Sequence, residues 1–157
     1  MIFLGIDPGA SGGIAIIAGN HVDAVAMPDT ERDVWHKIEA INIARDIGGA
    51  ESGRFFAIIE AVHSMPKQGV TSSFTFGRSY GFLRGCLIAS GIPFEEVTPQ
   101  RWQRELGCLS MGDKNRTKAR AQQLFPSLKI THATADALLL ATYAQRLYYK
   151  RHGGPEP

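Results

Sequence analysis

The chain has 157 residues, which is enough for one domain with a single hydrophobic core. Its 44% hydrophobic and 20% charged residues exclude a disordered chain and a fibrous repeat. The net charge of +2 hides an uneven distribution, because residues 1–60 carry 4 Lys/Arg and 9 Asp/Glu whereas residues 101–129 carry 7 and 2. This asymmetry favours a polyanionic partner, with a solvated helix face as the alternative.

The cysteine and hydropathy patterns predict a cytoplasmic protein. Cys86 and Cys108 form no C-x-x-C motif, which favours a reducing compartment over a disulfide framework or a zinc site. The apolar run over residues 2–6 ends at Asp7 and has no basic leader, and no stretch of the chain reaches 18 apolar residues. We therefore expect neither export nor a membrane-spanning segment.

The first part of the chain predicts four strands and a helix. Strands over residues 2–7, 13–18 and 21–27 are separated by turn residues, which indicates an antiparallel meander. Residues 30–47 carry apolar side chains at roughly helical spacing, and Gly48-Gly49 ends this helix. Residues 55–59 are continuously apolar, which is typical of a strand buried on both faces, and the run ends at Glu60.

The rest of the chain predicts alternating helices and strands. They are a helix over residues 72–90, a strand over 94–97, a short helix over 99–106, a basic helix over 115–125 and a last helix over 134–150. Because three strands precede the alternation, we expect an α/β fold with a mixed five-stranded sheet flanked by helices. Residues 1–150 would form this single domain, and residues 151–157 a frayed tail.

Three carboxylates fall at the ends of these predicted elements. Asp7 ends the first strand, Glu60 ends the fourth, and Asp136 lies in the first turn of the last helix, where the helix dipole favours its charge. If the first and fourth strands are neighbours, both strand ends lie at one edge of the sheet. Three carboxylates in one pocket repel each other unless a cation lies between them, and Mg²⁺ prefers such oxygen ligands. The alternatives are that Asp7 is only a turn residue, that Glu60 is only a strand end at the surface, and that the charge of Asp136 serves only the helix.

Five short motifs occur in an order that points to one nuclease family. They are GIDPGASG (5–12), IIE (58–60), FGRSYG (76–81), VTP (97–99) and ADALLLA (135–141). This set resembles the motifs of RuvC-type Holliday junction resolvases, which are RNase H-like nucleases. The resemblance implies an RNase H-like fold and a crossover junction endodeoxyribonuclease of DNA recombination and repair. It would act as a homodimer that nicks two strands of a four-way DNA junction symmetrically.

The resemblance also implies two Mg²⁺ ions in each active site, for which Mn²⁺ can substitute. Asp7, Glu60 and Asp136 would be catalytic metal ligands. Family members commonly place another acid three residues before the last Asp, but that position is Ala133 here. His132, four residues before Asp136 and on the same helical face, is the nearest candidate for the fourth ligand. The alternative for His132 is a hydrogen bond to the backbone where the helix begins.

Basic residues on and near the penultimate helix are candidates for contact with DNA phosphates. They are Arg101, Lys114, Arg116, Lys118 and Arg120. Such contacts give salt-dependent affinity without reading base sequence. In the family a lysine from this region approaches the cleaved phosphate, a role that the resemblance implies for Lys114 or Lys118. The alternative is a solvated basic helix.

The helix over residues 72–90 carries further candidates near its start. Arg78 is a predicted DNA contact, and Phe74 and Phe76 are predicted to stack on an opened base, which is worth about 1–3 kcal/mol. The alternative for each Phe is packing in the core.

The same helix has a stripe of small residues, four apart. They are Ser73, Gly77, Gly81, Gly85 and Ala89. Each helical glycine costs about 1 kcal/mol relative to alanine, so we expect another backbone to approach this face. That backbone is either the protein's own sheet or, as the resemblance implies, the helix between Ser72 and Ser90 of a second subunit.

Three other functions compete with the resolvase hypothesis. The turn over residues 7–13 also resembles the first phosphate-binding turn of sugar-kinase and actin-like ATPases, but 157 residues leave no room for their second lobe. A junction- or RNA-binding module without catalysis is favoured if the incomplete fourth ligand has abolished metal binding. A related nuclease could act on RNA, hybrids or flaps.

Overall fold

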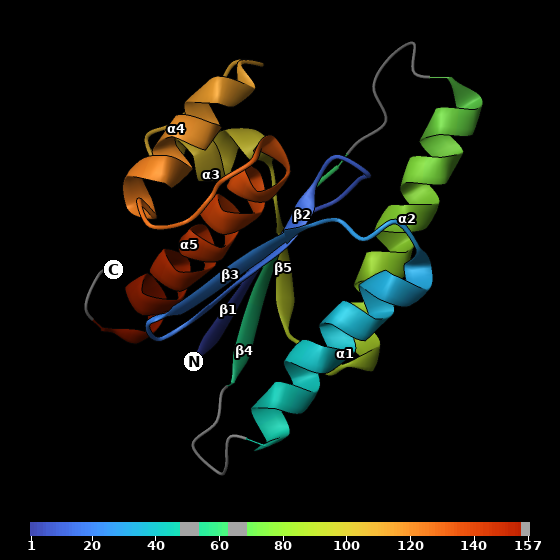
Figure 1. Cartoon of the computed structure of the whole chain (residues 1–157), viewed down its shortest axis with the longest axis horizontal. Coiled ribbons are helices and arrows are strands. Elements are labelled where there is room, and N and C mark those ends of the chain that lie inside the picture. Colours follow the sequence, from blue (N-terminus) through green and yellow to red (C-terminus); the bar gives the residue numbers. More distant parts are fainter. Residues whose placement is uncertain (48–53, 63–68, 155–157) are drawn as a thin grey trace.

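The computed structural model describes residues 1–47, 54–62 and 69–154 (Figure 1). In these ranges the strands are β1 (Ile2–Asp7), β2 (Gly13–Ala18), β3 (His21–Ala26), β4 (Phe55–Glu60) and β5 (Phe94–Val97). The helices are α1 (Glu31–Ile47), α2 (Val70–Ala89), α3 (Pro99–Glu105), α4 (Lys114–Leu124) and α5 (His132–His152). Every predicted strand and helix is present. The helix stop at Gly48-Gly49 and residues 155–157 of the predicted tail lie outside the described residues.

The five strands form one mixed sheet in the order β3-β2-β1-β4-β5. The β1–β2 and β2–β3 pairs are antiparallel, whereas β1–β4 and β4–β5 are parallel, which confirms the predicted sheet. In the parallel β1–β4 pair, Ile6 lies opposite Ile59. Asp7 and Glu60 are the next residues of these strands, so both leave the sheet at the same edge.

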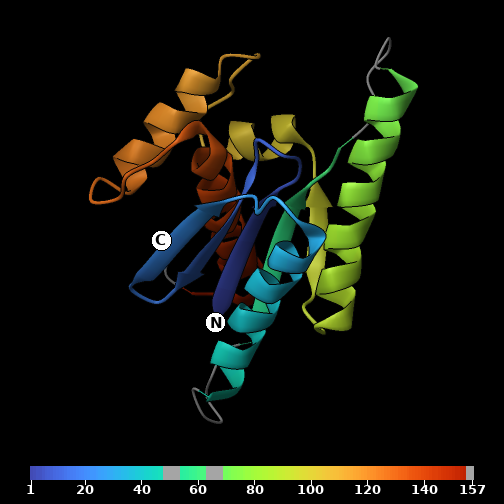
Figure 2. The same cartoon turned by 45° about the vertical axis from the view of Figure 1, so that its right-hand side comes forward.

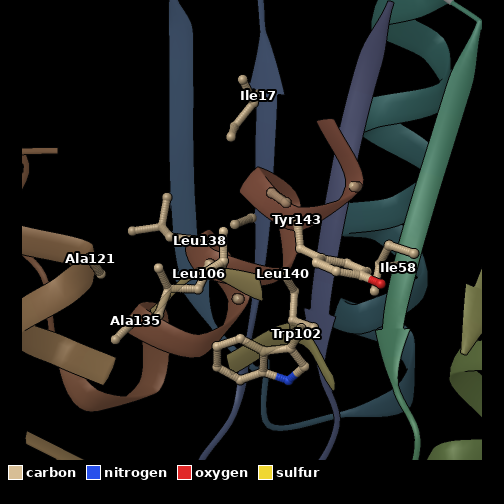
Figure 3. Close-up of a cluster of buried hydrophobic side chains, with 14 of the residues drawn as sticks. Ile17, Ile58, Trp102, Leu106, Ala121, Ala135, Leu138, Leu140 and Tyr143 are labelled. Carbon is tan, nitrogen blue, oxygen red and sulfur yellow. The ribbon is translucent and has the colours of Figure 1, made fainter. Parts of the chain in front are cut away.

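Helices cover both faces of the sheet and create two cores. Figures 1 and 2 show α3, α4 and α5 on one face and α1 and α2 on the other. Along β1, Phe3 packs in the core beneath α5, whereas Leu4 and Ile6 pack in the core with α1 and α2. Figure 3 shows part of the first core, where Trp102 of α3 lies close to Leu140 of α5. Burial of both faces explains the continuous apolar runs of β1 and β4. None of the described helices is long and apolar enough to cross a membrane.

Two glycines let α5 lie directly on the sheet. A Cβ added to Gly5 of β1 would lie 2.1 Å from the carbonyl oxygen of Ala137, and one added to Gly13 of β2 would lie 2.4 Å from that of Ala133. Backbone atoms cannot turn aside as the end of a side chain can, so a larger residue would push α5 outward. This close contact places Asp136, which precedes Ala137, near the carboxyl end of β1.

Helix α5 begins and ends two residues beyond its predicted bounds. Thr131 and Thr134 form a capping box in which the N–H of each donates to the hydroxyl of the other. Asp136 therefore lies in the second turn, and the prediction that it lies in the first turn, where the helix dipole acts most strongly, is wrong. At the other end, Arg151 belongs to the helix and forms an ion pair with Glu95 of β5.

Candidate functional site

Asp7 lies at the end of β1 in surroundings that disfavour its charge. Burial raises the pKa of Asp7 to about 8, the charges of Glu60 and Asp136 add to the rise, and the charge of Lys114 opposes it. Gly12 closes the turn behind this residue, because a Cβ there would lie 2.1 Å from the Asp7 carbonyl oxygen. Asp7 therefore holds a proton more tightly than an ordinary aspartate does.

Glu60, at the end of the neighbouring strand β4, is in a similar position. Burial raises its pKa to about 7, and the charge of Asp136 contributes, whereas a hydrogen bond from Trp102 and the charge of Lys114 lower it. The indole Nε1 of Trp102 donates that hydrogen bond to Oε2 of Glu60 over 2.7 Å. One oxygen of the carboxylate is therefore held by α3.

Asp136 of α5 is the third carboxyl group, and its charge acts on both Asp7 and Glu60. Burial raises its pKa, and the neighbouring Thr117 side chain and the charges of Lys114 and His132 lower it. Its Oδ1 is buried and finds no hydrogen-bond partner in the part of the chain that the structure describes. Such an unpaired buried oxygen is rare in native proteins, and an ion at the site is one explanation for it.

These carboxyl groups supply oxygen ligands but do not form a closed cage. Within residues 1–47, 54–62 and 69–154, no group of three or more His, Cys, Asp or Glu side chains is gathered closely enough to hold a metal ion. His132, predicted as the fourth ligand, is exposed at the first position of α5, and its charge acts on Asp136. The unpaired Oδ1 of Asp136 nevertheless fits a hard divalent cation, because such a cation takes carboxylate oxygens as ligands.

Lys114 is the basic residue that acts on all three carboxyl groups. It is the first residue of α4, where the side chain of Asp113 caps the helix by accepting a hydrogen bond from the N–H of Asn115 over 3.0 Å. Its charge lowers the pKa of Asp7, Glu60 and Asp136 alike. Figures 1 and 2 both show the first turns of α4 and α2 at the same end of the molecule, where β1 and β4 end.

Three of the other predicted DNA contacts already have partners within the protein. Arg120 donates from Nε to a carbonyl oxygen at the end of α3 over 3.0 Å. Arg78 forms an ion pair with Glu31 over 3.2 Å, and Arg101 lies near Tyr143, where its charge lowers the pKa that burial of the phenol raises. Positions two apart on a helix differ by about 200° in direction, so the alternating basic residues of α4 cannot share one face. Arg116 is exposed and Lys118 is half-buried.

Next to Glu60 there is a hollow of about 1030 Å³ between the sheet edge and α2. Phe76 of α2 lines it and reaches over the β1–β2 turn, because a Cβ on Gly9 would lie 3.2 Å from its ring. Phe76 is thus at the hollow and not in either core cluster. Phe74 is 72% exposed, so core packing is excluded for it as well.

The stripe of small residues on α2 faces outward. A Cβ on Gly77, Gly81 or Gly85 would meet no described atom within 4 Å, so this face does not pack on the protein's own sheet. The opposite face carries the buried residues of the helix, including Leu83 and Leu87. Of the two possibilities left open by the sequence, packing on the sheet is therefore excluded.

Sequence reasoning missed Trp102, whose Nε1 donates to Glu60, and Thr117, whose hydroxyl donates to the Lys114 carbonyl over 3.2 Å and lowers the pKa of Asp136. Trp102 is a large apolar residue within the otherwise polar helix α3, which was a signal for burial but not for a polar partner. Thr117 is buried in the polar helix α4, and nothing in the sequence around it indicates that it is buried.

No protein-family model and no curated protein matches this chain. Among solved structures it is similar to Thermus thermophilus RuvC, with 17% identity and a TM-score of 0.62 over 98% of this chain and 97% of that chain. It is also similar to T. thermophilus RuvC in complex with a Holliday junction substrate, with 18% identity and a TM-score of 0.60 over 98% and 96% of the two chains. A likeness that spans nearly the whole of both chains establishes the architecture, and the protein therefore has the RuvC-type, RNase H-like fold.

Proposed function

We propose that this protein is a metal-dependent endonuclease that cleaves phosphodiester bonds in four-way DNA junctions. The observation that carries the proposal is the group of carboxyl residues Asp7, Glu60 and Asp136, coupled to each other and to Lys114 at one edge of the sheet. The RuvC-type fold supports it, because one of the similar structures is RuvC with a Holliday junction substrate.

The three carboxylates would hold Mg²⁺ or Mn²⁺, with His132 as an additional ligand from the start of α5. Bound metal supplies an activated water and neutralises the charge that develops during phosphodiester hydrolysis. The chain's own contribution is to keep three oxygen-bearing side chains in one partly buried environment. Because their pKa values are raised, these groups release protons when a cation binds, and metal affinity should therefore increase with pH.

The DNA would lie along the end of the molecule where α2 and α4 begin. Lys114 would neutralise the phosphate next to the carboxylates, and Lys118, four residues later on the same face of α4, would contact a flanking phosphate. Arg116 points away from this face and would contact a phosphate on the other side of the helix. Phe76 lines the hollow beside Glu60, which is wide enough for an unpaired nucleotide. Phe74 is exposed at the first turns of α2 and free to stack on a base of the opened junction.

Cleavage of labelled junctions tests this function directly. The protein is incubated with Mg²⁺ or Mn²⁺ and a four-way junction, a duplex, a flap or an RNA–DNA hybrid. We expect paired nicks in the junction that disappear in Asp7→Asn and in Glu60→Gln. Asp23→Asn is a matched control, because Asp23 lies on the outer strand β3 and pairs with Lys37 over 3.2 Å. It should cut as the unchanged protein does.

The products separate the competing functions. Tight junction binding without cutting at any metal concentration would replace the endonuclease by a junction-binding module. Preferred cutting of the flap or the hybrid would keep the chemistry but change the substrate. Cutting that survives both Asp7→Asn and Glu60→Gln would reject the site.

The outer face of α2 is proposed to pair with the same face of a second chain. Ile88, near the end of this helix, is 68% exposed, and the glycines that precede it let another backbone approach closely. Two chains would provide the two active sites that symmetric nicking needs. Analytical ultracentrifugation should show a dimer at micromolar concentration that Gly81→Gln converts to a folded monomer. A monomeric unchanged protein would contradict the pairing.

A further inference from the structure

Trp102 connects the buried core to the candidate active site. Its side chain is completely buried (0% exposed), and its Nε1 donates to Oε2 of Glu60 over 2.7 Å. The contact joins residues 42 positions apart in the sequence. It forms because Glu60 lies opposite Val97 at the end of β5, and α3 begins two residues later at Pro99. The first turn of α3 is thereby placed beside the carboxylate.

The indole ring has little freedom to move. It packs in the core cluster with Leu106, Leu138 and Leu140, and Figure 3 shows it at the border of that cluster. The N–H is the only polar group of the side chain and can only donate. A buried N–H needs an acceptor, and Glu60 is the acceptor present here. The core therefore determines the position of one oxygen of a residue whose terminal torsion is otherwise broad.

We propose that Trp102 is a positioning residue for Glu60: its N–H holds Oε2 and thereby directs Oε1 to the divalent cation. This inference rests on the proposed function, in which Glu60 is a metal ligand. Asp136 provides a contrast, because its Oδ1 is buried and has no hydrogen-bond partner among the described residues. An oxygen of Glu60 is thus held by a hydrogen bond from the core, whereas no described donor holds Oδ1 of Asp136.

A role in packing alone makes a different prediction from a role in positioning. If Trp102 only fills the core, any ring of the same shape should serve as well. If it positions Glu60, removal of the N–H without a change in shape should weaken metal binding. Hydrogen-bond partners of metal ligands typically account for about 10- to 100-fold in metal affinity.

The test replaces Trp102 by β-(3-benzothienyl)alanine, which keeps the bicyclic shape and has sulfur in place of the N–H. Trp102→Phe is a second variant that also lacks the donor, and Trp35→Phe is the matched control on α1. The dissociation constant of Mn²⁺ is measured without DNA from the electron paramagnetic resonance of free Mn²⁺. The midpoint of thermal unfolding and junction binding in EDTA are measured in parallel.

We expect the benzothienyl variant to bind Mn²⁺ about 10- to 100-fold more weakly, while it still unfolds in one cooperative thermal transition and binds the junction in EDTA as the unchanged protein does. Trp102→Phe should weaken Mn²⁺ binding at least as much, and Trp35→Phe should leave it unchanged. Unaltered Mn²⁺ affinity in the benzothienyl variant would overturn the positioning role and leave the proposed function intact. If the unchanged protein bound no Mn²⁺ and cut no junction, the proposed function would fail, and the positioning role with it.

Discussion

Gly5 of β1 lies directly beneath α5, and its replacement by alanine should damage stability and activity together. The added methyl carbon would lie 2.1 Å from the carbonyl oxygen of Ala137 and 2.2 Å from the backbone nitrogen of Ala141. Contacts of a Cβ below 3.0 Å are essentially never seen, so α5 would have to retreat by about 1 Å. Overpacking of this kind costs about 1–3 kcal/mol, and the upper end applies because both clashing atoms belong to the backbone.

The same displacement should separate the carboxylates. Asp136 precedes Ala137 on the part of α5 that must move, whereas Asp7 remains on β1. A misplacement of about 1 Å in a catalytic group can cost about 100-fold in rate. We therefore expect Gly5→Ala to lower the free energy of unfolding by about 3 kcal/mol and junction cleavage by about 100-fold.

Urea unfolding and junction cleavage measure the two effects. Gly81→Ala is the matched control for the urea measurement, because the same methyl group meets open space in a single chain. At a concentration at which the chain is monomeric, it should raise the free energy of unfolding by about 1 kcal/mol. If Gly5→Ala unfolded at the urea concentration of the unchanged protein, the close contact between β1 and α5 would be refuted.

Three further predictions concern charge. Because burial and neighbouring charges raise the pKa of Asp7 from 3.8 to about 8, the folded protein holds this proton more tightly than the unfolded chain does. The metal-free protein should therefore lose stability as the pH rises from about 4 to about 8. Urea unfolding at several pH values should show a smaller loss in Asp7→Asn. An equal pH dependence of stability in both proteins would contradict this reasoning. Lys114→Met should reduce junction cleavage by about 100-fold. Lys118→Met is the control for the loss of a positive charge and should reduce cleavage less. Similar losses in the two variants would argue against a special role for Lys114. Arg116→Ala should reduce the slope of the logarithm of the DNA-binding constant against the logarithm of salt concentration by about one unit, and it should leave stability unchanged. Arg120→Ala should instead lower the free energy of unfolding by about 1 kcal/mol, because its hydrogen bond to the carbonyl oxygen at the end of α3 is lost. The opposite pattern for the two arginines would show that their environments have been misassigned.

Much of the fold could be predicted because it depends on local patterns. Continuous apolar runs with sharp polar ends located β1 and β4, and therefore placed Asp7 and Glu60 at strand ends. The start of α5 was less predictable. The usual capping box has Glu or Gln at its third helical position, whereas here Thr134 takes that role, and Asp136 was assigned to the wrong turn as a result.

Helix faces were harder to assign than helices. The glycine stripe of α2 was visible in the sequence, but whether it faced the sheet was not, because the helix is apolar on several sides. Leu83 and Leu87 pack inward and turn the stripe outward. Likewise, Arg120 looked equivalent to Arg116 in the sequence, and only the packing of α4 near α3 gave it a protein partner.

The sequence by itself determined which elements form and which residues end them, since hydrophobic periodicity, turns and caps act over a few residues. It thereby indicated that Asp7 and Glu60 both lie at strand ends and could form one site. Only the tertiary structure decided what surrounds them: the burial that raises their pKa values, the charge of Lys114, and the indole N–H that holds Glu60. These depend on contacts between segments far apart in the chain, which strand pairing and helix packing create.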